Sequence, residues 1–139
     1  MATILSVDDE LNPLILRKML LEKAGHQVIS ASSGAEALRL FDFAAPDLVL
    51  TDQVMQGMTG TELAEAIRER NPRVPIIIIS GLNEVPQNAS IADAFLSKLE
   101  GSAKLLRSIE IALALASATV DARDNDKDDD SEPDTNGAN

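Results

Sequence analysis

Short apolar runs alternate along this chain with longer segments in which apolar residues recur every three or four positions. The short runs predict buried strands, and the helical spacing predicts amphipathic helices. The predicted strands are 3–7, 26–31, 47–52, 74–80 and 94–98. The predicted long helices are 13–25, 35–45, 59–72 and 102–118, with Asn12 as N-cap and Pro13 as first residue of the first helix.

A strand followed by a helical segment occurs five times, with little room for the fourth helix between 80 and 94. Parallel neighbours need crossover connections, so this alternation predicts an α/β fold with helices on both faces of a parallel sheet. The run VPIIIIS is the most β-branched of all. It is therefore expected to be a central strand that is covered on both faces.

Composition changes this picture mainly near the C-terminus. The 139 residues suit one domain, which we expect to span 1–118. The net charge is −11, and the segment from Asp121 onward holds eight acidic and two basic residues with no apolar side chain larger than Ala. Such a segment cannot bury enough surface to offset the entropy of ordering, so 119–139 is predicted to be a disordered acidic tail.

Several classes of protein are disfavoured. The chain has no Cys, which excludes disulfides and thiolate metal sites. The N-terminus lacks the pattern of a signal peptide, and VPIIIIS is too short to span a bilayer, so we expect a cytoplasmic protein without membrane contact. The acidic body and tail would repel phosphates, so we expect no binding to nucleic acid.

Polar residues end four of the five predicted strands. They are Asp8 and Asp9 after the first, Asp52 after the third, Ser80 after the fourth and Lys98 after the fifth. Ligands of doubly wound sheets bind at these strand ends. Clustered carboxylates suit Mg²⁺, Lys and Ser can hold phosphoryl oxygens, and an Asp can serve as a phosphoryl acceptor.

Four stretches carry a resemblance to a known family: VDDE, PDLVLTDQVMQGMTG, IIIIS and FLSK. In this order and approximate spacing they resemble the receiver domain of two-component response regulators, over about residues 1–118. The resemblance implies a flavodoxin-like, doubly wound, five-stranded parallel sheet in strand order 2-1-3-4-5.

The resemblance also implies a role for each site residue. Asp52 is the phosphoacceptor, and the ligands of Mg²⁺, or of another divalent cation in its place, are Asp8, Asp9, Asp52 and the backbone carbonyl of Val54. Lys98 contacts the phosphoryl group, Ser80 is the switch hydroxyl and Phe95 is the switch aromatic residue.

These roles imply a stand-alone response regulator that takes a phosphoryl group from the phosphohistidine of a histidine kinase or phosphotransfer protein. It would then change its contacts with a downstream protein that the sequence does not name. Such a domain is not an enzyme beyond its own phosphorylation and dephosphorylation. A pseudo-receiver that binds partners without phosphorylation is the main alternative, and a metal-dependent phosphatase is disfavoured because the acceptor ends the third strand rather than the first.

The sequence departs from the family pattern in three places. Leu99 follows Lys98 where Pro is usual, which predicts a trans peptide bond and an altered loop. Gln56 also replaces a usual Pro, which is expected to loosen the loop after Asp52. The stretch 81–97 is short, and its Pro86, Asn88 and Ser90 disfavour a helix interior, so the fourth helix is predicted to have one or two turns at most.

Other residues suggest properties outside the acidic site. Ile111 and Leu115 lie four positions apart on the last predicted helix, away from its core face. Two exposed aliphatic residues are common and need no role, so a partner or homodimer patch is the alternative interpretation. Apolar Val54 and Leu82, two residues beyond Asp52 and Ser80, predict a long-lived phosphoryl form because they would hinder an attacking water. His26 is expected to have a surface or packing role.

Overall fold

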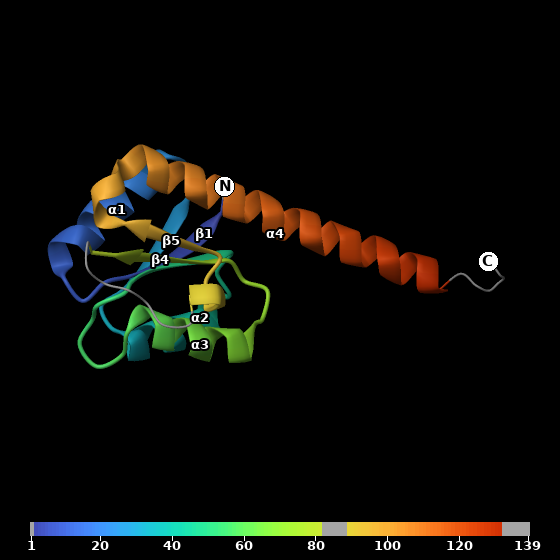
Figure 1. Ribbon diagram of the computed structural model, residues 1–139, viewed down its shortest axis with the longest axis horizontal. Coiled ribbons are helices and arrows are strands. Elements are labelled where there is room, and N and C mark those ends of the chain that lie inside the picture. The colour runs from blue at the N-terminus through green and yellow to red at the C-terminus, as the bar shows by residue number, and fades with distance from the viewer. Residues whose placement is uncertain (1, 82–88, 132–139) are drawn as a thin grey trace.

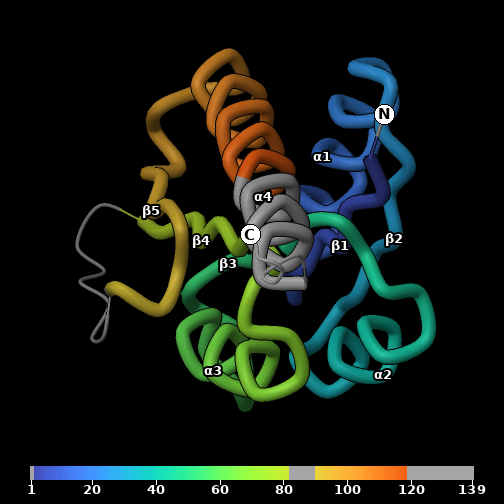
Figure 2. Tube along the Cα trace, turned by 90° about the vertical axis from the view of Figure 1, so that its right-hand side faces the viewer, coloured from blue at the N-terminus to red at the C-terminus, as the bar shows by residue number. Residues whose placement is uncertain are grey.

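The computed structural model describes residues 2–81 and 89–131, with side chains described up to Ala118. The five strands are β1 (Thr3–Val7), β2 (Gln27–Ala31), β3 (Leu48–Asp52), β4 (Ile76–Ser80) and β5 (Ala94–Ser97). They form one parallel sheet in the order β2-β1-β3-β4-β5 (Figures 1 and 2). The predicted doubly wound sheet and its strand order are confirmed.

The long helices cover the two faces of the sheet in pairs. Figure 2 shows α1 (Leu11–Lys23) and α4 (Gly101–Ser131) on one face, with α2 (Gly34–Ala44) and α3 (Gly60–Arg70) on the other. Side chains alternate along β4, so that Ile77 and Ile79 enter the core beneath α1 and α4, while Ile76 and Ile78 enter the core beneath α2 and α3. This two-sided burial explains the apolar run that the sequence shows at 76–79.

The first helix starts earlier than the sequence predicts. Glu10 is the N-cap of α1 and Leu11 its first residue, so Asn12 is not the cap. The side chain of Glu10 caps nothing, but Asp8 Oδ1 accepts a hydrogen bond from the Glu10 backbone N–H at 2.9 Å. A residue of the acidic cluster thus fixes the start of α1 and displaces the expected cap.

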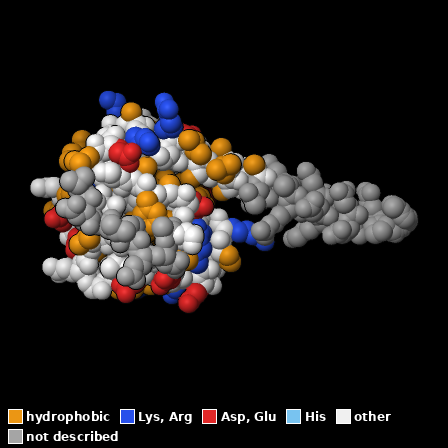
Figure 3. All heavy atoms as spheres, viewed as in Figure 1, with side chains coloured by type: hydrophobic (Ala, Val, Ile, Leu, Met, Phe, Trp, Pro, Cys, Tyr) orange, Lys and Arg blue, Asp and Glu red, His pale blue; other side chains and the backbone are white. Residues whose placement is uncertain are grey.

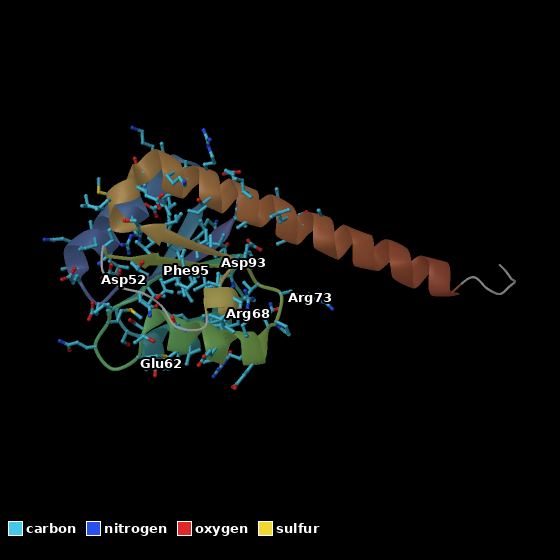
Figure 4. All side chains as sticks on the ribbon, in the orientation of Figure 1. Asp52, Glu62, Arg68, Arg73, Asp93 and Phe95 are labelled. Carbon is cyan, nitrogen blue, oxygen red and sulfur yellow. The ribbon has the colours of Figure 1, made fainter. Side chains whose placement is uncertain are left out.

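The connection between β4 and β5 is compact where it is described. It contains the 3-10 turn η1 (Ala89–Ile91) and no α-helix among its described residues, while 82–88 lie outside them. Arg68 of α3 anchors the connection, since its Nε donates to Ile91 O at 3.1 Å and its Nη2 pairs with Asp93 Oδ2 at 2.8 Å (Figure 4). The described part of the connection thus agrees with a short fourth helix, and the prediction stays untested for 82–88.

The last helix is longer than predicted. The backbone of α4 stays helical to Ser131, past the predicted domain boundary at 118 and into the segment expected to be a disordered tail (Figure 1). Residues 132–139 lie outside the described part of the chain, so disorder there stays a prediction. None of the helices that the structure describes combines the length and apolar character needed to cross a bilayer.

Candidate functional site

Three carboxylates meet at the carboxyl ends of β1 and β3. The two strands pair in register, with Val7 opposite Thr51, so Asp8 and Asp52 follow at neighbouring positions. One oxygen from each of Asp8, Asp9 and Asp52 lies within 4.8 Å of the others. Asp8 and Asp52 are 1% and 2% exposed, so two of these charges are held away from water.

Lys98 supplies a cation to this pocket. Its Nζ lies 3.0 Å from Asp52 Oδ1. The residue begins the 3-10 turn η2 (Lys98–Glu100), which a capping box fixes: Ser97 Oγ accepts from Leu99 N, and Glu100 Oε1 accepts from Ser97 N. The described residues contain no cis peptide, so the predicted trans bond between Lys98 and Leu99 is confirmed. The capped turn thus aims Lys98 at Asp52 without a Pro.

The electrostatics of Asp52 follow from its burial. Loss of hydration raises the pKa of the Asp52 carboxyl above its ordinary value, and repulsion from Asp8 raises it further. The Lys98 ammonium opposes both effects by stabilising the carboxylate, and Arg17 does so more weakly, but the pKa stays raised. Extra positive charge in the pocket would therefore favour the ionised, nucleophilic form of Asp52.

Arg17 is a site residue that the sequence interpretation missed. Its Nη1 donates to Asp8 Oδ2 at 2.8 Å, and its side chain is only 12% exposed. A signal for it was present in the spacing. Arg17 lies three residues after Leu14 and four before Leu21, the two buried leucines of α1, and therefore on the same helix face. An Arg on a core-facing stripe needs a buried partner, which Asp8 provides.

The loop after β3 is held against the pocket by its own polar groups. The Gln56 backbone N–H donates to Asp9 Oδ2 at 2.9 Å, a bond that a Pro at this position could not make. Gln53 Oε1 accepts from both the N–H and the hydroxyl of Thr61, at 3.0 and 2.9 Å. Gly60 allows the loop to pack closely against the end of β3, because a Cβ at this position would lie only 2.5 Å from Asp52 O. The departure at Gln56 therefore gives Asp9 a partner and attaches the loop that the missing Pro was expected to loosen.

The remaining predicted residues of the site lie around this pocket. Ser80 is buried at the end of β4, where it pairs in register with Ser97. Phe95 of β5 is partly buried and packs into the core beneath α3, opposite Ile78 (Figure 4). Val54 is exposed in the loop after β3. The prediction of a long-lived phosphoryl form rests on Val54 and Leu82, and Leu82 lies outside the described residues.

Two other predicted features lie away from the pocket. Ile111 and Leu115 are exposed on α4, where Figure 3 shows a group of hydrophobic side chains, and they line a groove of about 530 Å³ with Arg73. Arg73 lies at the end of the domain away from Asp52 (Figure 4). His26 is buried just before β2, where its Nδ1 accepts from Ala2 N at 3.3 Å. The patch and the histidine therefore take no part in the acidic site.

The donor set of the pocket fits a hard divalent cation. Carboxylate oxygens that converge from Asp8, Asp9 and Asp52 are the ligands that Mg²⁺ prefers, and Mg²⁺ completes its octahedron with waters and substrate oxygens. Beside the pocket runs a groove of about 460 Å³ between α1 and the turn after β5, lined by Arg17, Lys98 and two further carboxylates.

Comparisons with known proteins agree with this geometry. The transcriptional regulatory protein GlrR of Escherichia coli is 33% identical over 116 residues, which are 81% of this chain and 26% of that protein. Protein PilH of Pseudomonas aeruginosa is 31% identical over 120 residues, 82% of this chain and 99% of that protein. The first three curated relatives are longer proteins, of which the chain spans only 26%, 26% and 34%.

Solved structures show the same likeness. A response regulator receiver domain protein from Clostridium thermocellum has a TM-score of 0.75 and 30% identity, covering 88% of this chain and 98% of that one. Response regulator TrrA from Thermotoga maritima, solved in complex with Mg²⁺–BeF, has a TM-score of 0.76 and 31% identity, covering 81% and 99%. The family model of the response regulator receiver domain matches residues 4–110, and this chain belongs to that family.

Proposed function

We propose that this receiver domain accepts a phosphoryl group on Asp52 from the phosphohistidine of a histidine kinase or phosphotransfer protein. One observation carries the proposal. The buried Asp52 carboxylate has the Lys98 ammonium at 3.0 Å and the oxygens of Asp8 and Asp9 within 4.8 Å. A carboxylate nucleophile, a fixed cation and two further oxygen ligands are the parts that phosphoryl transfer to an Asp needs.

Each step of the transfer has a group to perform it. A bond forms between an Asp52 oxygen and phosphorus, while the bond from phosphorus to the imidazole nitrogen breaks and leaves its electron pair on that nitrogen. Lys98 neutralises charge that spreads over the phosphoryl oxygens. Bound Mg²⁺ would supply further neutralisation, held by Asp8, Asp9, Asp52 and the Val54 carbonyl. The structure of TrrA with Mg²⁺–BeF supports a metal at this site.

The switch would follow from the new charge on Asp52. Ser80, buried at the end of β4, would donate its hydroxyl to a phosphoryl oxygen, and Phe95 on the neighbouring strand would repack. The contacts of a downstream protein, or of a second copy of the chain, would then change. The proposal retains the expected cytoplasmic location, the absence of nucleic-acid binding and the lack of any enzymatic turnover beyond phosphorylation and dephosphorylation of Asp52.

A pseudo-receiver is the second candidate, and one observation favours it. Arg17 and the Gln56 N–H already engage one oxygen each of Asp8 and Asp9, two of the carboxylates that a metal would need. If these bonds are permanent, the pocket is a structural cluster rather than a phosphorylation site. The domain would then bind partners in one state only.

Mass spectrometry after incubation with acetyl phosphate and Mg²⁺ separates the two candidates. We expect the wild type to gain the mass of one phosphoryl group and Asp52→Asn to gain none. Asp42→Asn is the matched control, because this exposed carboxylate pairs with Arg70 near the C-terminal ends of α2 and α3 and should leave the mass gain intact. A wild type that gains no mass, or an Asp52→Asn variant that still does, would refute phosphorylation at Asp52.

A further inference from the structure

The Arg17 guanidinium already engages Asp8, a carboxylate that the proposed metal site needs. Asp8 has two carboxylate oxygens, and both have partners: Oδ1 accepts from Glu10 N at 2.9 Å and Oδ2 from Arg17 Nη1 at 2.8 Å. Asp8 is 1% exposed, so few directions of approach remain. A cation that binds Asp8 through Oδ2 therefore meets the guanidinium first.

The balance of charges in the pocket also indicates that Arg17 and a divalent cation compete for Asp8. The pocket gathers three carboxylates, and two fixed cations face them: Lys98 against Asp52 and Arg17 against Asp8. Without Arg17 the buried Asp8 carboxylate would have no cationic partner among the described residues. With a divalent cation in place as well, positive charge would exceed negative charge in a poorly hydrated pocket, and the guanidinium would be repelled.

A groove next to Arg17 could hold its guanidinium after displacement from Asp8. Arg17 already lines the groove between α1 and the turn after β5. The same groove is lined by Glu10 and Glu100, so alternative carboxylate partners lie within the space that the Arg17 side chain borders. In this groove the positive charge of Arg17 would still be near carboxylates, those of Glu10 and Glu100.

We propose that Arg17 is a tethered cation that holds Asp8 in the metal-free protein, and that a divalent cation binds by displacing its guanidinium into the adjoining groove. The inference rests on the metal site of the proposed function. Arg17 is a positioning residue rather than a catalytic one. It stabilises the metal-free fold and lowers the affinity of the pocket for metal, and so sets the metal concentration at which Asp52 becomes reactive.

Titration of the full chain with Mn²⁺, followed by electron paramagnetic resonance, measures this competition without phosphorylation. Arg17→Met keeps much of the apolar stem and removes the charge, so we expect it to bind Mn²⁺ about tenfold more tightly than the wild type. Lys18→Met is the matched control. It removes the same charge from the next residue of α1, which pairs with Glu22 at 4.0 Å rather than with Asp8, and should change the affinity less than about twofold.

A second measurement needs no variant and so does not depend on Arg17→Met folding. In the metal-free wild type the Arg17 Nη1–H, which donates to Asp8 Oδ2, should give a protected resonance in a nitrogen-detected side-chain spectrum. Addition of Mg²⁺ should shift or broaden it while the Arg70 signal, from an exposed pair with Asp42, stays unchanged. Arg17→Lys, which keeps the charge with a shorter reach, should bind Mn²⁺ with an affinity between those of wild type and Arg17→Met.

The outcomes separate this inference from the proposed function. In one outcome the wild type binds metal and is phosphorylated on Asp52, but Arg17→Met binds Mn²⁺ no more tightly than the wild type and Mg²⁺ does not change the Arg17 resonance. The tethered-cation role is then wrong, and the phosphoacceptor function stands. If wild type, Arg17→Met and Arg17→Lys all fail to bind Mn²⁺, the metal site itself is wrong and both proposals fall.

Discussion

Lys98 Nζ lies 3.0 Å from Asp52 Oδ1, although β4 separates the strands that the two residues follow. The pair forms because β3 and β5 end at the same edge of a parallel sheet. It stabilises the ionised Asp52 against the burial that raises its pKa.

Removal of the Lys98 charge should raise the pKa of Asp52 further. Its hydrogen bond is the strongest influence that lowers this pKa, so Lys98→Met should shift the carboxyl titration, followed by ¹³C NMR, to higher pH. Phosphorylation by acetyl phosphate should slow by about a hundredfold, as expected for loss of one charge-stabilising donor. Lys104→Met, whose ammonium pairs with exposed Glu100, should change neither quantity. An unshifted Asp52 titration would contradict the pairing.

Asp52→Asn should stabilise the metal-free fold in a pH-dependent way. Because folding raises the pKa of Asp52, the folded chain binds this proton more tightly than the unfolded chain, and stability falls as pH rises through the interval from 3.8 to the raised value. Above that interval the variant should therefore unfold at higher urea concentration than the wild type. The advantage should shrink as pH falls toward the ordinary carboxyl value.

Urea midpoints without metal, near neutral pH and near pH 4, check the Asp52→Asn prediction. Asp42→Asn serves again as control, because its carboxylate is exposed and paired with Arg70, and it should gain no stability at neutral pH. Equal urea midpoints for wild type and Asp52→Asn at neutral pH would show that burial of the Asp52 carboxylate does not lower the free energy of unfolding.

Gln56→Pro should weaken the attachment of the loop after β3. The substitution removes the N–H that donates to Asp9 Oδ2 at 2.9 Å, a bond to a charged group worth about 1.5–3 kcal/mol at most and less at an exposed site. Gln56→Ala keeps the N–H and is the matched control. We expect urea unfolding to show a loss of stability for the Pro variant alone. If Gln56→Ala loses as much, the side chain rather than the backbone holds the loop.

Ile111→Glu combined with Leu115→Glu tests the predicted interaction patch. Both side chains are more than half exposed on α4, so the charges should cost the fold less than about 1 kcal/mol while they disrupt an apolar contact. We expect light scattering to show loss of any dimer, or pull-down to show loss of a partner. Phe43→Glu, at another exposed apolar position, is the control. An unchanged oligomeric state together with unchanged partner binding would refute the prediction that Ile111 and Leu115 form an interaction patch.

The alternating pattern of the chain was sufficient to predict the sheet, its parallel strands and the polar residues at the strand ends. Asp8, Asp52, Ser80 and Lys98 could be located because each directly follows or ends a strand, and strand ends are visible in the sequence as the places where an apolar run stops. The shortened segment after β4 was equally visible, because Pro and Asn in a short stretch limit helix length.

Tertiary structure alone decided how the charges in the pocket are balanced. The contacts of Arg17 with Asp8 and of the Gln56 N–H with Asp9 depend on how α1 and the loop after β3 lie against the strand ends. Local pattern could place Arg17 on the inner face of α1, but not choose its partner. The raised pKa of Asp52 is likewise a property of burial and of neighbours from three separate elements. Sequence determines which groups are present near the site, and packing determines which of them meet, because ångström distances between distant segments set electrostatic energies.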